Sequence, residues 1–183
     1  MISKTANSGG GPIIVLPAEI AHLWRRTLPS VGVEVPEGWQ WLNGDIICDY
    51  DDINDLIYFG FDFFGWLPVE DGKALVLFTD EQDITFVPET RGGVIVENFS
   101  ETDAVEELIK TVPSTAWRLY PQTINLIDGR LFLFDSAYQG CQNPEEIMAV
   151  DDVVVAQLSP GSYNIFYYYN AEHNVFIRFE KQE

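Results

Sequence analysis

The chain has 183 residues, of which 46% are hydrophobic, and its 10 basic and 29 acidic residues give a net charge of −19. This length and composition are typical of one globular domain with a sizeable core. A protein that binds DNA, RNA or an anionic membrane directly needs a basic surface, so the negative charge excludes these classes of protein.

Cysteine content and the lack of long apolar runs predict a cytoplasmic protein. Cys48 and Cys141 are far apart in the sequence, which favours two free thiols in a reducing compartment, with a disulfide between them as the alternative. Ile13-Ile14-Val15-Leu16 is too short for the apolar region of a signal peptide. No apolar run reaches the roughly 20 residues that a membrane-spanning helix needs.

The N-terminal part predicts a flexible start, then a strand and a helix. Residues 1–11 are polar and rich in glycine, which is typical of a flexible segment. Pro12 to Leu16 predicts a short buried strand, and Pro17 favours the start of a helix. The apolar face of this helix is formed by residues three and four positions apart, which are Ile20, Leu23 and Trp24.

An acidic stretch follows, because Thr27 to Gly72 contains ten Asp or Glu residues and no Lys or Arg. Within it, Asp49 to Tyr58 predicts a helix with Asp49 as its N-cap. The apolar side of this helix carries Tyr50, Ile53, Leu56 and Ile57. The opposite side carries Asp51, Asp52 and Asp55.

The centre of the chain predicts two hairpins and one well-marked helix. The hairpin turns contain glycine, and the paired strands are Trp66 to Val69 with Ala74 to Phe78, and Ile84 to Val87 with Val94 to Phe99. Ser100 is expected to cap the helix, with Asp103 in the capping-box position, and Pro113 ends it. Its apolar stripe is Val105, Leu108, Ile109 and Val112.

The last third predicts strands, with residues 139–152 as either a loop or a short helix at 145–148. The expected strands are Ala116 to Tyr120, Thr123 to Ile127, Leu131 to Asp135, Val153 to Leu158, Tyr163 to Asn170 and Val175 to Glu180. Asp128-Gly129 is expected to turn one hairpin and Ala171 to Asn174 another. Residues 12–183 thus predict a single α+β domain, mainly antiparallel β-sheet with two or three helices.

Catalytic and metal-binding patterns are weak. His22 is expected at the solvent side of its helix and His173 in a turn, so neither suggests a nucleophile–histidine pair. Scattered Cys and His residues do not fit a zinc site. An EF-hand loop beginning at Asp49 would have Asn54 at position six and Gly60 at position twelve, where calcium binding requires Gly and Glu. We therefore expect no metal, no cofactor and no enzyme activity.

Aromatic residues within the acidic stretch suggest a surface that binds a partner. Tyr and Trp beside carboxylates are typical of a patch that docks onto a basic protein, since opposite charges speed association and fix the register of the two proteins. The predicted contact residues are Asp51, Asp52, Asp55, Tyr58, Trp39 and Trp41. The C-terminal strands around Tyr167 and Tyr169 are the alternative location.

Several segments in order resemble the Immunity protein 21 family of bacterial polymorphic toxin systems, over about Gly10 to Tyr168. They are Gly10 to Pro17 before a helix with Trp24, Asp49-Tyr50-Asp51, Trp66-Leu67-Pro68-Val69, Gly72, Ala74 to Leu77, Thr85 to Pro88, Gly92-Gly93, Leu133 to Ala137 and Pro160 to Tyr163. Family members tend to have Arg-Ala-Cys after Asp-Tyr-Asp, whereas this chain has Asp52-Ile53-Asn54. The resemblance implies a cytoplasmic protein that binds and neutralises a cognate toxin, and it implies no catalytic residues.

Three functions are weighed on this basis. The first is an immunity protein that covers the active site or substrate groove of a toxin with a basic surface, such as a nuclease. The second is an adaptor domain that recognises a basic peptide or regulator. The third is a small hydrolase that depends on carboxylates, for which a strongly raised carboxylate pKa in a deep cleft would be evidence.

Overall fold

The computed structural model describes residues 4–6, 12–24, 40–42, 45–47, 64–69, 72–77, 84–97, 102–136, 153–170 and 174–183. These residues are mainly β-structure with one α-helix and one 3-10 helix. In chain order the elements are β1 (Lys4–Ala6), β2 (Ile13–Pro17), η1 (Ala18–Leu23), β3 (Gln40–Leu42), β4 (Asp45–Ile47), β5 (Phe64–Val69), β6 (Gly72–Leu77), β7 (Ile84–Glu89), β8 (Gly92–Glu97), α2 (Thr102–Thr111), β9 (Arg118–Leu126), β10 (Arg130–Asp135), β11 (Val154–Gln157), β12 (Gly161–Tyr169) and β13 (Val175–Lys181).

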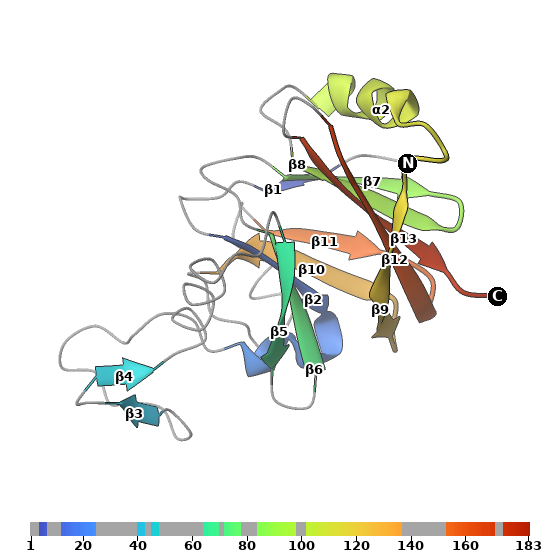
Figure 1. Cartoon of the computed structure of the whole chain (residues 1–183). Helices are drawn as coiled ribbons and strands as arrows, with labels where there is room; N and C mark the ends of the chain where they lie inside the picture. The colour runs from blue at the N-terminus through green and yellow to red at the C-terminus, as the bar shows by residue number, and fades with distance from the viewer. Residues whose placement is uncertain are drawn as a thin grey trace.

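Two antiparallel sheets pack face to face (Figure 1). Sheet A has the strand order β1-β7-β8-β13-β12-β9, and sheet B has the order β11-β10-β2-β6-β5, while β3 pairs with β4. The prediction of a mainly antiparallel β-fold with few helices is confirmed. No helix among the described residues is long and apolar enough to cross a membrane.

The main core lies between the sheets and is built from alternate residues of each strand. Sheet A contributes residues such as Phe86, Ile177 and Phe179, and sheet B contributes residues such as Val15 and Leu133, all at most 3% exposed. Alternation of this kind follows from the two-residue period of a strand, which sends successive side chains to opposite faces of the sheet.

Each sheet is covered on its outer face by one of the helices. On sheet B, Ala21 of η1 and the neighbouring Trp24 pack against Leu16 and Phe134. The indole Nε1 of Trp24 also donates a hydrogen bond of 3.0 Å to the carbonyl of Ser136. The predicted face of this helix is confirmed, although the segment is a 3-10 helix rather than an α-helix.

On sheet A, α2 covers strands β7, β8 and β13 (Figure 1). Val105 and Ile109 are buried, and Leu108 and Val112 pack beside them. The apolar stripe predicted for this helix is therefore confirmed.

Three predicted hairpins are confirmed: β5 pairs with β6, β7 with β8, and β12 with β13. Within the segment that is expected to be flexible, Lys4–Ala6 forms β1 and pairs with β7. The hydroxyls of Thr5 and Thr85 lie 3.1 Å apart across this pair.

Two predictions about β9 are wrong. The segments 116–120 and 123–127, expected as separate strands, form one strand, Arg118–Leu126. Its register with β12 shifts at a bulge that contains Pro121. A bulge suits proline, because proline has no N–H to give to the ladder. Asp128-Gly129 does not turn a hairpin, because β9 pairs with β12 in sheet A and β10 pairs with β2 and β11 in sheet B. The chain instead crosses between the sheets at this corner.

Asp128 and Gly129 shape this corner. The Asp128 carboxylate accepts hydrogen bonds from the backbone N–H (2.9 Å) and from Nε (2.7 Å) of Arg130, and these contacts lower the pKa of Asp128. Gly129 has φ +82°, and a Cβ at this position would lie 2.3 Å from the carbonyl oxygen of Leu158. Only glycine fits this combination of backbone angle and close approach.

Replacing Gly129 with alanine is expected to lower the free energy of unfolding by about 1–3 kcal/mol, because the backbone is left-handed and the new methyl group meets backbone. Urea denaturation measures this loss. Gly72→Ala is the control, since a Cβ there lies closest to the flexible Ile20 side chain, at 2.6 Å. Equal losses for the two variants would contradict the prediction.

Candidate functional site

The predicted contact residues fall mostly outside the part of the chain that the structure describes. Trp39, Asp51, Asp52, Asp55 and Tyr58 are not among the described residues. The backbone of Trp41 lies in β3, opposite Ile46 of β4. The grouping of these residues on one acidic surface therefore stays a prediction.

Three exposed apolar side chains lie along the β9–β12 edge of sheet A. Among the described residues the exposed large hydrophobic side chains are Leu119 (60%), Ile127 (70%) and Tyr169 (43%). Leu119 and Tyr169 lie near one end of the β9–β12 ladder, whereas Ile127 directly follows β9 at the other end. They therefore belong to two separate places on the surface rather than to one apolar patch.

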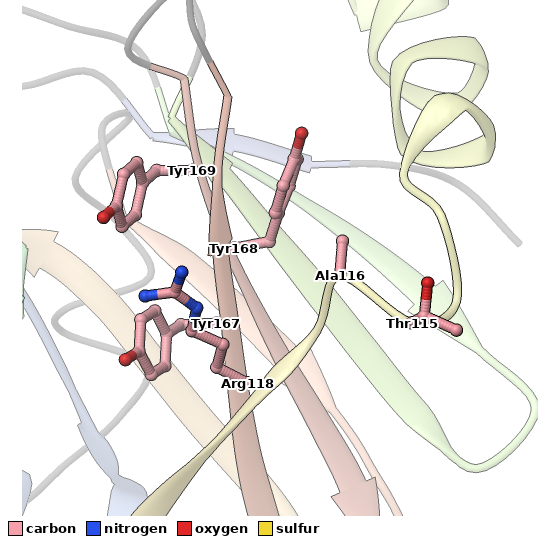
Figure 2. Close-up of a pocket in the computed structure, with 6 residues that line it drawn as sticks. All are labelled: Thr115, Ala116, Arg118, Tyr167, Tyr168 and Tyr169. Atoms are coloured by element: carbon pink, nitrogen blue, oxygen red, sulfur yellow. The ribbon is translucent and has the colours of Figure 1, made fainter.

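A hollow of about 260 Å³ lies beside the end of β12 (Figure 2). It is lined by Thr115, Ala116, Arg118, Tyr167, Tyr168 and Tyr169. In Figure 2 the Arg118 guanidinium lies between the rings of Tyr167 and Tyr169, and its Cζ is 5.9 Å from the centroid of the Tyr169 ring. Tyr and Arg are, with Trp, the residue types enriched at the anchor points of protein–protein interfaces.

The alternation of β12 sends its tyrosines to opposite faces of sheet A. Tyr168 lies on the side of α2 (Figure 2), with its ring centroid 6.3 Å from that of Trp117 and 5.6 Å from that of Phe176. The guanidinium of Arg178 stacks on the Trp117 ring, with its Cζ 4.1 Å from the ring centroid. It also donates a hydrogen bond of 2.9 Å to the carboxylate of Glu89. These contacts fix one wall of the hollow.

An aromatic cluster closes the sandwich where β5 and β9, the edge strands of the two sheets, meet. Phe64 lies 5.1 Å from Tyr120 and 5.3 Å from Tyr167 between ring centroids, and Trp66 lies 6.4 Å from Tyr120. Burial, and secondly the neighbouring Tyr167, raises the pKa of Tyr120, so its hydroxyl stays a neutral hydrogen-bond donor around pH 7. The cluster holds Tyr167 in place at the rim of the hollow.

The sequence names the strands around Tyr167 and Tyr169 as the alternative location, which stays a prediction, and it gives no sign of Arg118 beside them. Arg118 faces Tyr167 directly across the β9–β12 ladder. Nothing near Arg118 in the sequence signals this neighbour, because it depends on the register between two distant strands.

Groups that could support catalysis or hold a metal are scarce in the described ranges. There, no three His, Cys, Asp or Glu side chains gather into a possible metal site. His22 is exposed, as predicted. His173, Cys48 and Cys141 lie outside the described residues.

Comparison with known proteins identifies the family. The family model for Immunity protein 21 matches residues 5–175. Comparison with curated proteins gave no match, and comparison with solved structures gave none either. The match spans most of the chain and agrees with the ordered segments found in the sequence, so the chain belongs to the Immunity protein 21 family.

Proposed function

We propose that this protein is a cytoplasmic immunity protein that binds and neutralises a cognate bacterial toxin by direct contact. Membership of an immunity-protein family supports this function. The observation that carries it is the hollow at the end of β12, where Arg118 and Tyr167 lie beside the exposed Tyr169. The proposed activity is binding without a metal, a cofactor or a chemical step.

The charge of the chain suggests the kind of toxin. A net charge of −19 attracts a basic surface, such as a groove that binds nucleic acid, and raises the rate of association. By covering this groove the protein would exclude the substrate of the toxin. The proposed acidic contacts are Asp51, Asp52 and Asp55, with Tyr58 and either Trp39 or Trp41 as aromatic anchors.

Reversing Asp51, Asp52 and Asp55 to lysine tests the acidic contacts. Affinity for the toxin encoded by the adjacent gene is expected to fall by at least about tenfold, and protection of cells is expected to be lost. The melting temperature should stay equal or rise slightly, because the three reversals lower the net charge from −19 to −13 and so reduce the self-repulsion of the chain. Calorimetric titration, a growth assay and thermal unfolding measure the three results.

The other outcomes separate the alternatives. Unfolding of the triple variant would show that the aspartates serve the fold. Unchanged binding by the triple variant, with loss of binding on Tyr169→Ala, would place the contact at the hollow instead.

Affinity for the toxin should also fall as the salt concentration rises, since exposed charges are screened over about 8 Å at physiological ionic strength. A wild-type protein that neither binds nor protects would overturn the proposed function.

A further inference from the structure

A cleft of about 540 Å³ lies at the end of the sandwich where η1, the β5–β6 hairpin and the end of β9 meet. In Figure 1 this is the end of the molecule at which the blue η1 lies beside β6. The walls include Ile20, Pro68 and Trp66, and Ile127 stands at the rim with 70% of its surface exposed. The cleft is separate from the hollow at Tyr167–Tyr169, with which it shares no lining residue.

Glu19 places a carboxylate in the wall of this cleft. Its Oε1 accepts a hydrogen bond of 2.7 Å from the backbone N–H of Ile127. Its Oε2 is shielded from solvent and has no hydrogen-bond partner. A shielded carboxylate oxygen without a donor costs free energy, so this atom favours an incoming donor.

Trp66 adds an unpaired donor to the same cleft. Its Nε1–H is shielded from solvent and has no acceptor, although a buried indole N–H usually has one. A backbone carbonyl of an extended segment would supply this acceptor, while a basic side chain of the same segment would supply the donor for Glu19. Side chains at interfaces commonly change rotamer on binding, which lets both atoms turn towards the segment.

We propose that this cleft binds an extended segment of the toxin that carries an arginine or lysine side chain. The basic side chain pairs with Glu19, a backbone carbonyl accepts the Trp66 Nε1–H, and apolar groups of the segment cover Ile20 and Ile127. Charge complementarity supports a basic occupant, because the chain carries −19 in total and Glu19 has an unpaired oxygen. The proposal rests on the proposed toxin-binding function and assigns a second contact surface to it.

Lys73 allows a second test of the proposal, because it carries the opposite charge to Glu19 in the same cleft. It is an exposed residue that lines the same cleft, so its ammonium group repels a basic segment. Removing the charge of Glu19 and reversing the charge of Lys73 should therefore change the affinity in opposite directions.

The experiment measures the affinity of the full-length protein for the toxin, encoded by the adjacent gene and inactivated at its catalytic site, by calorimetric titration. Glu19→Gln keeps an oxygen for the Ile127 N–H and removes only the charge, and it is expected to weaken binding by about tenfold. Ile127→Ser is expected to weaken binding several-fold without loss of stability, and Lys73→Glu is expected to strengthen it several-fold. Glu107→Gln, an exposed side chain on α2, is the control and should leave the affinity within twofold.

The outcomes distinguish this proposal from the proposed function. If the wild-type protein binds and protects while Glu19→Gln and Ile127→Ser bind equally well, the cleft assignment is overturned and the immunity function stands. If Lys73→Glu weakens binding and Glu19→Gln strengthens it, the cleft takes an acidic segment and the proposal is wrong. Hydrogen exchange of the Ile127 amide gives an independent readout, because a bound segment should slow its exchange in the wild-type protein.

Discussion

Replacing Trp24 with alanine is expected to lower the free energy of unfolding by about 3–5 kcal/mol. The Trp24 side chain is fully buried and packs against Ile14, Leu16, Phe132 and Phe134 on the outer face of sheet B. The loss combines the missing transfer of an aromatic ring from water with the cavity that it leaves. Urea denaturation of the two proteins measures the difference.

Trp24→Phe tests the contribution of the Trp24 hydrogen bond separately from the packing of the ring. The phenyl ring retains most of the packing but cannot donate to the Ser136 carbonyl, which accepts the Trp24 Nε1–H at 3.0 Å. We expect this variant to lose about 1–3 kcal/mol, the usual cost of leaving a buried acceptor unpaired. A Trp24→Ala variant as stable as Trp24→Phe would show that the ring contributes little and that the prediction is wrong.

Glu97 is expected to make stability depend on pH around neutrality. Its side chain is 5% exposed at the end of β8, and burial raises its pKa from 4.5 to about 7. The folded state therefore binds this proton more tightly than the unfolded chain does. The protonated Glu97 therefore contributes to the free energy of unfolding. This contribution is fully present below pH 4.5 and is lost as the pH rises to about 7, a change of about 3 kcal/mol.

Glu97→Gln removes this ionisation, so the variant should match the wild type near pH 4.5 and exceed its stability by up to about 3 kcal/mol at pH 8. Urea denaturation at a series of pH values measures the difference between the two proteins. Glu183→Gln is the matched control, because its side chain is 90% exposed and it removes the same single charge from an acidic chain. A pH-independent gap between Glu97→Gln and the wild type would contradict the prediction.

Local signals explain which parts of the fold could be predicted. The β5–β6, β7–β8 and β12–β13 hairpins join neighbouring runs of β-forming residues through turns marked in the sequence. The α2 stripe repeats at helical spacing and ends before Pro113. In each case the signal itself lies within about twenty positions of the sequence, so it could be recognised locally.

Long-range pairing explains the errors. Asp128-Gly129 has the composition of a hairpin turn, but turn chemistry does not specify which strand the next segment joins, and β10 enters sheet B. Pro121 suggests a break between two strands, whereas the β9–β12 bulge accommodates it within one. The pairing of Glu19 with Ile127 spans 108 positions, and no local pattern could place these two residues in one cleft.

The position of β13 has a consequence for the synthesis of this protein. Sheet A contains β1, β7 and β8 on one side and β12 and β9 on the other, and β13 joins the two groups. Since β13 is Val175–Lys181, sheet A cannot close before residue 181 has left the ribosome. At roughly 5–20 residues per second the ribosome needs roughly 10–40 s for these 181 residues. Until β13 emerges, the edge of β8 lacks the strand with which it pairs in the folded protein.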